Sequence, residues 1–231
     1  MLNLILETIL TKHVSTAEVA DALGKTGVMS GISSLNSGHF VAAEAFYICT
    51  WGNSNWSLHE QAQQIPPGHI VYVDTINCGD QAILGDLVAR WLLIHQKSTG
   101  VIVNGLVRDV HRLRKEDYPI WCTGYTPLGC SNERVECSSS TDSYIKSQNK
   151  KFDGAILVAD DSGCALIRSE FQNQDLLDRI NFIKLQEDIR YFCTDKLKMS
   201  TYETVCLKRY LREVDLLPQE LQASLQSFSI S

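Results

Sequence analysis

The 231-residue sequence lacks the features that mark several common classes of protein. No apolar run is long enough to cross a bilayer, so no transmembrane helix and no membrane partner are predicted. The eight cysteines form no C-x-x-C pair, and no histidine pair stands near them at zinc-ligand spacing, which argues against a zinc finger. The net charge of −6 argues against a nucleic-acid surface, which normally needs a clustered basic face.

The N-terminal stretch also lacks the features of a secretory signal. "MLNLILETILTKHVS" has a short apolar patch, but it has no basic start and no small-residue cleavage site. A cytoplasmic protein is therefore expected. Thiols stay reduced in that compartment, and we expect buried, inert side chains for most of the cysteines, which are Cys49, Cys78, Cys122, Cys130, Cys137, Cys164, Cys193 and Cys206.

The length predicts one large domain or one domain with an appendage. Near the N-terminus, Ser15 and Glu18 have the spacing of a capping box and predict a helix that ends near Gly24. The stretches "GHFVAAEAFYICT" and "GHIVYVDTIN" predict strands. No internal repeat is visible, so a repeat architecture is not expected.

A strand–helix–strand pattern follows in the middle of the chain. After Gly85, the residues Val88, Trp91, Leu92 and His95 recur at helical spacing. The short apolar run "VIVNG" then predicts a strand. A strand, a helix and a strand in this order form a βαβ-like unit, which is typical of α/β proteins.

The second half of the chain is more varied. Residues 129–151 are rich in serine and asparagine and predict an exposed loop or an edge hairpin. Residues 154–169 predict a hairpin that turns at Asp160–Gly163. The chain is predicted to be helical from Leu176 onward, with two more short helices after Met199 and one apolar face made by Phe182, Leu185, Ile189 and Phe192.

A fixed positive and a fixed negative charge, Arg108 and Asp109, stand just beyond the "VIVNG" strand. In α/β proteins, ligands collect at the carboxyl ends of strands. A guanidinium can bind a carboxylate with two N–H groups, and an aspartate can hold a hard divalent cation. The dipeptide alone, however, favours a surface ion pair worth about 0–1 kcal/mol.

The segment Gly85-Asp86-Leu87 stands where the central helix is expected to begin. The first N–H groups of a helix and its dipole favour an anion, and a glycine there leaves room for one. A helix simply capped by the Asp86 side chain is an equally good interpretation of this segment alone.

Several motifs in order resemble the ribonuclease-regulator-A-like family, which includes the class II 4-hydroxy-4-methyl-2-oxoglutarate aldolases and oxaloacetate decarboxylases. The resemblance covers roughly residues 14–167 and rests on "STAEVADALG", Gly85-Asp86-Leu87, "GLVRD" at 105–109, "YPIWCTGYTP" and "GAILVADDSGCALI". The chain departs from the family pattern in one extra residue between Asp86 and Arg108 and in Ala155, where the family usually has aspartate.

The resemblance implies an α/β fold of the swivelling β/β/α type, with three layers, over a catalytic domain of residues 1–170. Because the rest of the chain is predicted to be helical, we expect a C-terminal helical extension over residues 171–231 that packs on the domain or on a neighbouring subunit. The family is usually assembled as trimers, so the resemblance also implies a homotrimer or a dimer of trimers.

The resemblance further implies a divalent metal, Mg²⁺ or Mn²⁺, bound by Asp109. Arg108 would bind a 2-keto acid and stabilise its enolate, and the backbone N–H groups of Gly85, Asp86 and Leu87 would hold its carboxylate. Asp86 would join the outer metal shell or a proton relay. An acidic residue from a neighbouring subunit's C-terminal region approaches the metal in family aldolases. Glu187 is the candidate, although a solvated helix face is the simpler interpretation of this residue.

The function implied is that of a metal-dependent lyase that cleaves a C–C bond of a pyruvate-derived 2-keto acid, as in aldolases and oxaloacetate decarboxylases. Two alternatives remain. One is a non-catalytic regulator that binds a ribonuclease, although such relatives commonly lack the aspartate that this chain has as Asp109. The other is a diverged enzyme for a larger, sugar-like keto acid, which the unusual 128–151 loop and the C-terminal tail suggest.

Overall fold

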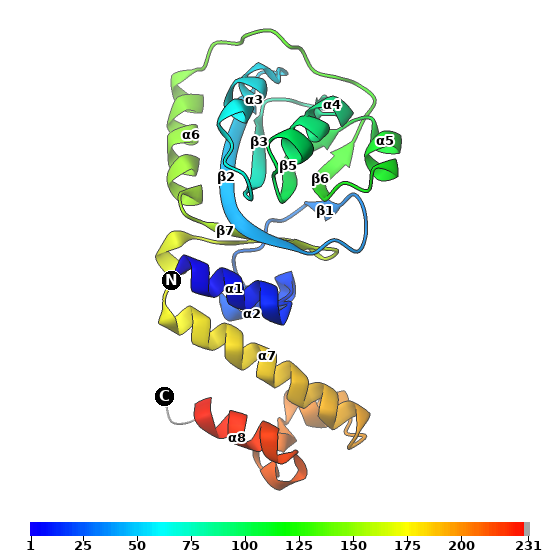
Figure 1. Ribbon diagram of the computed structural model, residues 1–231, viewed down its shortest axis with the longest axis vertical. Coiled ribbons are helices and arrows are strands. Elements are labelled where there is room, and N and C mark those ends of the chain that lie inside the picture. Colours follow the sequence, from blue (N-terminus) through cyan, green and yellow to red (C-terminus); the bar gives the residue numbers. More distant parts are fainter. Residues whose placement is uncertain (229–231) are drawn as a thin grey trace. The chain divides into compact units, whose positions relative to one another are not determined.

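The long strand β2 (Val41–Trp51) belongs to two layers of β-structure in the computed structural model, which describes residues 1–228. Its N-terminal part pairs antiparallel with β7 (Ile156–Asp160), and the rest of it pairs parallel with β3 (Ile70–Ile76). Figure 1 shows β2 bending between these two partners. A single strand therefore forms backbone hydrogen bonds in both layers and connects them.

The strands of the described residues are ordered β1-β6-β5-β3-β2-β7-β8, with β4 beside β5. β3, β5 and β6 run parallel to β2, whereas β1 pairs antiparallel with β6 and β8 pairs antiparallel with β7. The parallel strands therefore bring their carboxyl ends to one edge of the sheet. The remaining bounds are β1 (Ser33–Ser34), β4 (Ala82–Leu84), β5 (Gly100–Val107), β6 (Ile120–Tyr125) and β8 (Gly163–Ile167).

Helices α3 (Trp56–Gln61), α4 (Asp86–Arg90) and α5 (Val110–Lys115) cover one face of the parallel sheet (Figure 1). α3 continues into a 3-10 turn at Ala62–Gln64, and α4 continues into a π-helical turn at Trp91–His95. The odd-numbered residues of β3 and β5 point to this face because side chains alternate along a strand. They form the larger core with helix residues such as Leu58, Leu92 and Leu113.

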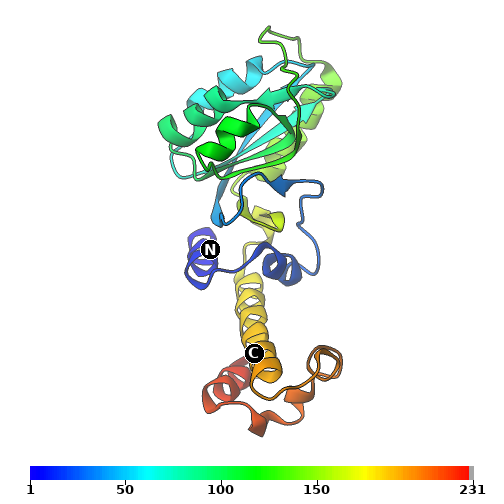
Figure 2. The ribbon, with the colours of Figure 1, turned by 90° about the vertical axis from the view of Figure 1, so that its right-hand side faces the viewer.

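The opposite face of the sheet is covered by the β7–β8 hairpin and by α6 (Ser139–Phe152). Figure 2 shows α6, in yellow-green, across the sheet from the cyan and green helices. Tyr72 and Trp121 from the sheet pack there with Phe152 of α6. Helices, parallel sheet and hairpin make three layers, which confirms the predicted α/β class with a β/β/α arrangement.

Three shorter elements complete the first compact unit, Met1–Asn173. α1 (Leu2–Lys12) and α2 (Thr16–Ala22) precede the sheet, and a 3-10 turn spans Ser169–Phe171. The predicted capping box is confirmed, because the Ser15 hydroxyl accepts from the Glu18 amide and the Glu18 carboxylate accepts from the Ser15 amide at 2.7 Å. The predicted hairpin at Asp160–Gly163 is confirmed as β7–β8.

The prediction of a loop or edge hairpin over residues 129–151 is wrong for its second half, which is helix α6. Ser138 caps this helix by accepting from the Thr141 amide, and Asp142 pairs with Lys146 one turn later. Serine favours loops within a sequence pattern, but it is also a strong N-cap residue. Burial of Phe152 fixes the other end of the helix on the sheet.

The second compact unit begins at Gln174 and is helical. It contains α7 (Gln174–Asp195), a π-helical turn at Tyr202–Cys206, 3-10 turns at Arg209–Leu211 and Val214–Leu216, and α8 (Gln219–Phe228). The predicted apolar face of α7 is confirmed, because Ile189 is buried in a small core with Phe182, Leu185 and Phe192 packed against it. Within residues 1–228, no helix has both the length and the apolar character that a membrane crossing needs.

Candidate functional site

Arg108 and Asp109 follow directly on β5, at the edge of the sheet where the parallel strands end. The Arg108 amide donates to the carbonyl of Leu84 at 2.9 Å, which joins the end of β5 to the end of β4. Asp109 precedes α5 in the left-handed conformation, with φ 58° and ψ 30°. Aspartate adopts this conformation more readily than most residues, and such backbone is common at functional sites.

The structure brings the second predicted motif to the same place. Gly85 precedes α4, and the Asp86 amide at the start of that helix donates to Asp109 Oδ2 at 3.2 Å. A Cβ atom on Gly85 would lie 2.5 Å from Asp109 Oδ2 and 3.1 Å from Arg108 Cγ. The glycine is therefore what allows the carboxylate and the guanidinium to approach the start of α4.

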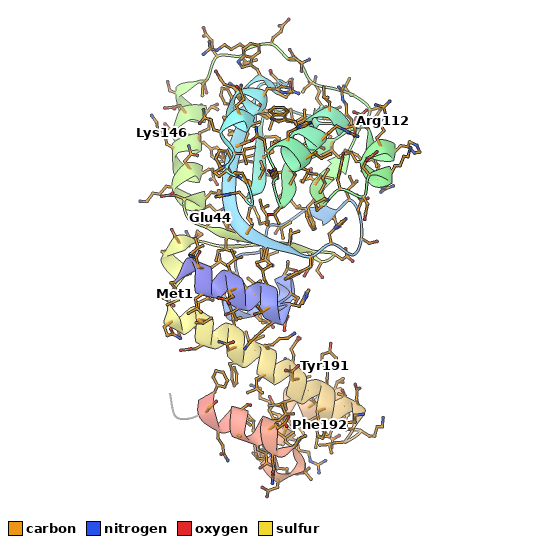
Figure 3. All side chains as sticks on the ribbon, in the orientation of Figure 1. Met1, Glu44, Arg112, Lys146, Tyr191 and Phe192 are labelled. Carbon is orange, nitrogen blue, oxygen red and sulfur yellow. The ribbon has the colours of Figure 1, made fainter. Side chains whose placement is uncertain are left out.

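The anion site expected at Gly85-Asp86-Leu87 stays a prediction, whereas the alternative of a helix capped by Asp86 is wrong. The Asp86 side chain makes no capping hydrogen bond to α4, and the carboxylate at the helix start belongs to Asp109. Asp86 Oδ2 lies 3.9 Å from Nη1 of Arg112 on α5, whose position Figure 3 labels. Asp86 Oδ1 is buried and has no hydrogen-bond partner. A buried carboxylate oxygen without a donor is costly, so this atom is a candidate acceptor for a bound group.

The segment that follows β6 covers Arg108. The Ala82 amide donates to the Leu128 carbonyl at 2.8 Å, and the Cys130 amide donates to the Ala82 carbonyl at 3.2 Å. Gly129 lies between these bonds, where a Cβ atom would overlap the Arg108 guanidinium. Its lack of a side chain thus lets the backbone lie against Arg108, a requirement that the sequence pattern did not reveal.

A pocket of about 220 Å³ opens beside these residues. Its lining includes Leu87, Val88, Arg108 and Asp109, together with Asn55, His59, Cys130 and Asn132. Leu87 is 79% exposed, and the Arg108 and Asp109 side chains are 50% and 43% exposed. The two charged groups are therefore half open to solvent at the pocket, which leaves them available to a small anion or a cation.

Sequence reasoning missed the polar residues of this pocket that come from other segments. Asn55 and His59 follow the end of β2, one helical turn apart, and Asn132 lies in the segment after β6. A usable signal was present, since "NSNWSLH" follows a strand that runs parallel to β5. Neighbouring parallel strands end at one edge, so polar residues after each of them were expected near Arg108.

The donor set suits a hard divalent cation better than zinc. Within residues 1–228, no group of three or more His, Cys, Asp or Glu side chains is placed to hold a metal. Magnesium is commonly bound by one or two carboxylates, and water fills its other positions. The half-exposed Asp109 carboxylate fits that pattern. It accepts a hydrogen bond from the Asp86 amide, and the side chain of Asp86 carries the oxygen that has no partner.

Glu187 lies on α7, in the other compact unit, and is partly buried there. Its predicted role beside a metal belongs to an assembly of several subunits. That role therefore stays a prediction, as does the packing of residues 171–231 on the domain or on a neighbouring subunit.

Comparisons with known proteins agree with this architecture. Solved structures of similar fold include an uncharacterized protein from Pseudomonas syringae pv. tomato, with a TM-score of 0.61, 20% identity and coverage of 81% of this chain and 86% of that chain. Another is Streptomyces coelicolor RraAS2, an unusual member of the RNase ES inhibitor RraA protein family, with a TM-score of 0.61, 20% identity and coverage of 80% and 95%. At this identity they show the fold alone.

Two curated proteins are similar in sequence. Protein DlpA of Legionella pneumophila is 26% identical over 184 residues, which are 76% of this chain and 29% of DlpA. The "Putative 4-hydroxy-4-methyl-2-oxoglutarate aldolase" of Halalkalibacterium halodurans is 29% identical over 119 residues, which are 50% of this chain and 55% of that protein. The matches thus span about a third and about half of these relatives.

A family model described as "RraA-like: Aldolase/RraA" matches residues 16–166, the segment that contains the sheet, α4 and the Arg108-Asp109 pair. This match covers well over half of the chain and agrees with the resemblance carried by the sequence motifs. The chain belongs to the Aldolase/RraA family.

Proposed function

We propose that this protein is a divalent-metal-dependent lyase that cleaves a C–C bond of a pyruvate-derived 2-oxo acid. The observation that carries the proposal is the position of Asp109, half exposed at the pocket, beside Arg108 and at the start of α4. A guanidinium, a carboxylate and helix amides within a few ångströms of one another suit a ligand that combines an anion with a metal ion.

Asp109 would hold Mg²⁺ or Mn²⁺, with water in most of the remaining positions. A cation bound there supplies a Lewis acid for the adjacent carboxylate and ketone oxygens of a 2-oxo acid. The Asp109 backbone supports this role, because its left-handed conformation directs the side chain to the start of α4.

Arg108 would bind the oxygens of the 2-oxo acid and stabilise the negative charge that grows on the ketone oxygen as the C–C bond breaks. The backbone at Gly129 lies against its guanidinium, and a Cβ atom on Gly85 would lie 3.2 Å from its Nε, so backbone without side chains borders the group at both positions. In addition, Gly85 and Leu87 would place backbone N–H groups near the substrate carboxylate, while the Asp86 N–H donates to Asp109. Asp86 Oδ1, which has no partner, would accept a proton or a hydrogen bond from bound water.

A second candidate is a regulator that binds a ribonuclease, because one relative of similar fold, Streptomyces coelicolor RraAS2, is a member of the RNase ES inhibitor RraA protein family. The pocket and Asp109 favour the enzyme. A homotrimer or a dimer of trimers, with Glu187 approaching the site of a neighbouring subunit, is part of the same proposal.

The direct test is pyruvate release from oxaloacetate and from 4-hydroxy-4-methyl-2-oxoglutarate, measured with Mg²⁺, with Mn²⁺ and with excess chelator. Asp109→Asn is the variant of choice, because asparagine also tolerates the left-handed conformation. We expect turnover to require the cation and to fall at least about a thousandfold in Asp109→Asn, which corresponds to roughly 4 kcal/mol.

Asp142→Asn is the matched control, since it removes the same charge from a half-exposed position on α6, where Asp142 pairs with Lys146. It should keep full activity. Undiminished turnover in chelator, or in Asp109→Asn, would exclude this mechanism. Specific capture of a ribonuclease by a protein without lyase turnover would favour the regulator.

A further inference from the structure

The end of the pocket beyond Arg108 and Asp109 has no fixed charge. Among the described residues that line the pocket, Arg108 is the sole lysine or arginine and Asp109 the sole acid. The other polar side chains are the amides of Asn55 and Asn132, the imidazole of His59 and the thiol of Cys130. Amide groups and imidazole nitrogens form hydrogen bonds with hydroxyl groups.

Asn55 adds a specific requirement. It is only 8% exposed, and its side-chain Nδ2 donates to the Ile83 carbonyl at a long 3.4 Å. Its Oδ1 is buried and has no partner. A buried acceptor that lacks a donor is costly, so a ligand that brings a donor gains from it. A carboxylate is an acceptor only and cannot supply one, whereas a hydroxyl can.

A second carboxylate would meet the opposite situation. It would lose its hydration against Asn55, His59 and Asn132 without gaining a fixed cation, and burial of an unpaired charge is expensive. The volume of about 220 Å³ lies below the roughly 300–1,000 Å³ typical of sites for drug-sized ligands, so the occupant is a small metabolite.

We propose that Asn55, His59 and Asn132 form a subsite for the hydroxyl-bearing tail of a 2-oxo acid with a single carboxylate. This inference rests on the proposed lyase function and specifies its substrate class. It predicts that the protein disfavours dicarboxylic 2-oxo acids, because Arg108 is the sole lysine or arginine among the described residues that line the pocket.

The reaction on such a substrate is a retro-aldol cleavage. The bond breaks between the methylene next to the ketone and the hydroxyl-bearing carbon that follows it. The hydroxyl group loses its proton to a base, and its carbon and oxygen become the carbonyl group of an aldehyde. The electron pair of the broken bond passes to the methylene carbon and the ketone as an enolate. A proton taken up at that carbon gives pyruvate, so no oxidant or reductant is consumed.

Two measurements separate this inference from the proposed function. Exchange of the pyruvate methyl protons in D₂O with Mg²⁺, followed by NMR, reports enolate formation without any tail. The ratio of kcat/KM for 2-oxo-3-deoxygluconate, which has one carboxylate and a polyhydroxyl tail, to kcat/KM for oxaloacetate and for 4-hydroxy-4-methyl-2-oxoglutarate reports the subsite. We expect a ratio of at least about ten, the effect of one well-placed hydrogen bond.

Asn132→Lys places a cation in the exposed segment of the subsite. It should lower this ratio about tenfold by improving kcat/KM for the two dicarboxylates. Asn3→Lys is the matched control, since Asn3 is an exposed residue of α1 outside the pocket and the variant adds the same charge. It should leave the ratio unchanged.

His59→Leu should lower kcat/KM for 2-oxo-3-deoxygluconate more than it lowers pyruvate exchange, because only the former uses the tail. A wild-type preference for the dicarboxylates, with exchange intact, would overturn the subsite and leave the lyase standing. An absence of exchange in the metal-loaded protein would instead remove the proposed function.

Discussion

Two aspartates near the ends of parallel strands, Asp74 of β3 and Asp109 after β5, have opposite surroundings. Asp74 is 2% exposed and accepts from three neutral donors, Tyr47 Oη at 3.1 Å, Tyr144 Oη at 2.9 Å and Asn104 Nδ2 at 2.9 Å. Asp109 is 43% exposed and accepts from one backbone amide. The same residue type thus occupies a closed network in one place and an open pocket in the other.

This difference shows that the surroundings of a carboxylate decide whether it stabilises the fold or is open to a ligand. Asp74 is buried and accepts three hydrogen bonds from side chains of β2, β5 and α6, so it holds those elements together and is closed to a ligand. Asp109 keeps lone pairs free at a pocket that also contains Arg108. Both residues lie near the end of a strand. They differ in how many hydrogen bonds their carboxylates accept.

The largest effect on stability is expected from Asp74→Ala. The substitution leaves the donors of Tyr47, Tyr144 and Asn104 unpaired, two of them on the sheet, so the free energy of unfolding should fall by about 3 kcal/mol. Asp109→Asn should lower it by less than about 1 kcal/mol, the value of a charge at a helix start. Urea titrations of both variants measure the difference, and equal losses would refute the contrast drawn between the two sites.

A smaller effect, on activity, is expected from Gly85→Ala. The new methyl group would meet Asp109 Oδ2 at 2.5 Å, so the carboxylate must move, and a shift of about 1 Å at a reacting centre costs on the order of a hundredfold. Gly124→Ala is the control, since its Cβ meets only a flexible Leu106 methyl at 3.2 Å. Steady-state pyruvate release measures both, and similar rates for the two variants would argue that Asp109 is not held in a working position.

The smallest effect is expected from Tyr144→Phe, which removes one bond to Asp74 and should cost about 1 kcal/mol near neutral pH. Burial, and then the Asp74 carboxylate, raise the pKa of Tyr144 from 10.0 to about 12. A raised pKa means that this tyrosine stabilises the fold fully below pH 10, and the contribution is lost as the pH rises through 12.

Urea unfolding of wild type and Tyr144→Phe across pH 9 to 12 tests this pH dependence. The gap in unfolding free energy between the two proteins should narrow as the pH rises. A gap that stays constant to pH 12 would show that Tyr144 does not titrate against Asp74. The other tyrosines titrate in both proteins, so they cancel in the comparison.

Local patterns were sufficient where the relevant residues are neighbours in the chain. The capping box at Ser15, the hairpin at Asp160–Gly163 and the helix after Gly85 each depend on residues a few positions apart. Helix α6 was not predicted because its sequence is polar and rich in serine, a composition that also favours loops. Its attachment depends on Tyr144 reaching Asp74, seventy positions away.

Part of the candidate site was accessible from sequence in the same way. Arg108, Asp109 and Gly85 belong to short motifs whose residue types indicate a chemical role, and the structure brings these residues together. Asn55, Gly129 and Asn132 carry no motif. Asn55 and Asn132 line the pocket, and Gly129 lies against Arg108, because β2, β5 and β6 end at one edge of the sheet.

The order of polar and apolar residues by itself determined which segments become strands and helices, and which charged residues follow the strands. It did so because backbone geometry and capping act over a few residues. Only the tertiary structure decided that Asp74 is surrounded by hydrogen-bond donors whereas Asp109 stays exposed at a pocket. Saturation of a carboxylate depends on donors from distant segments, and only packing of those segments brings the donors within hydrogen-bonding distance.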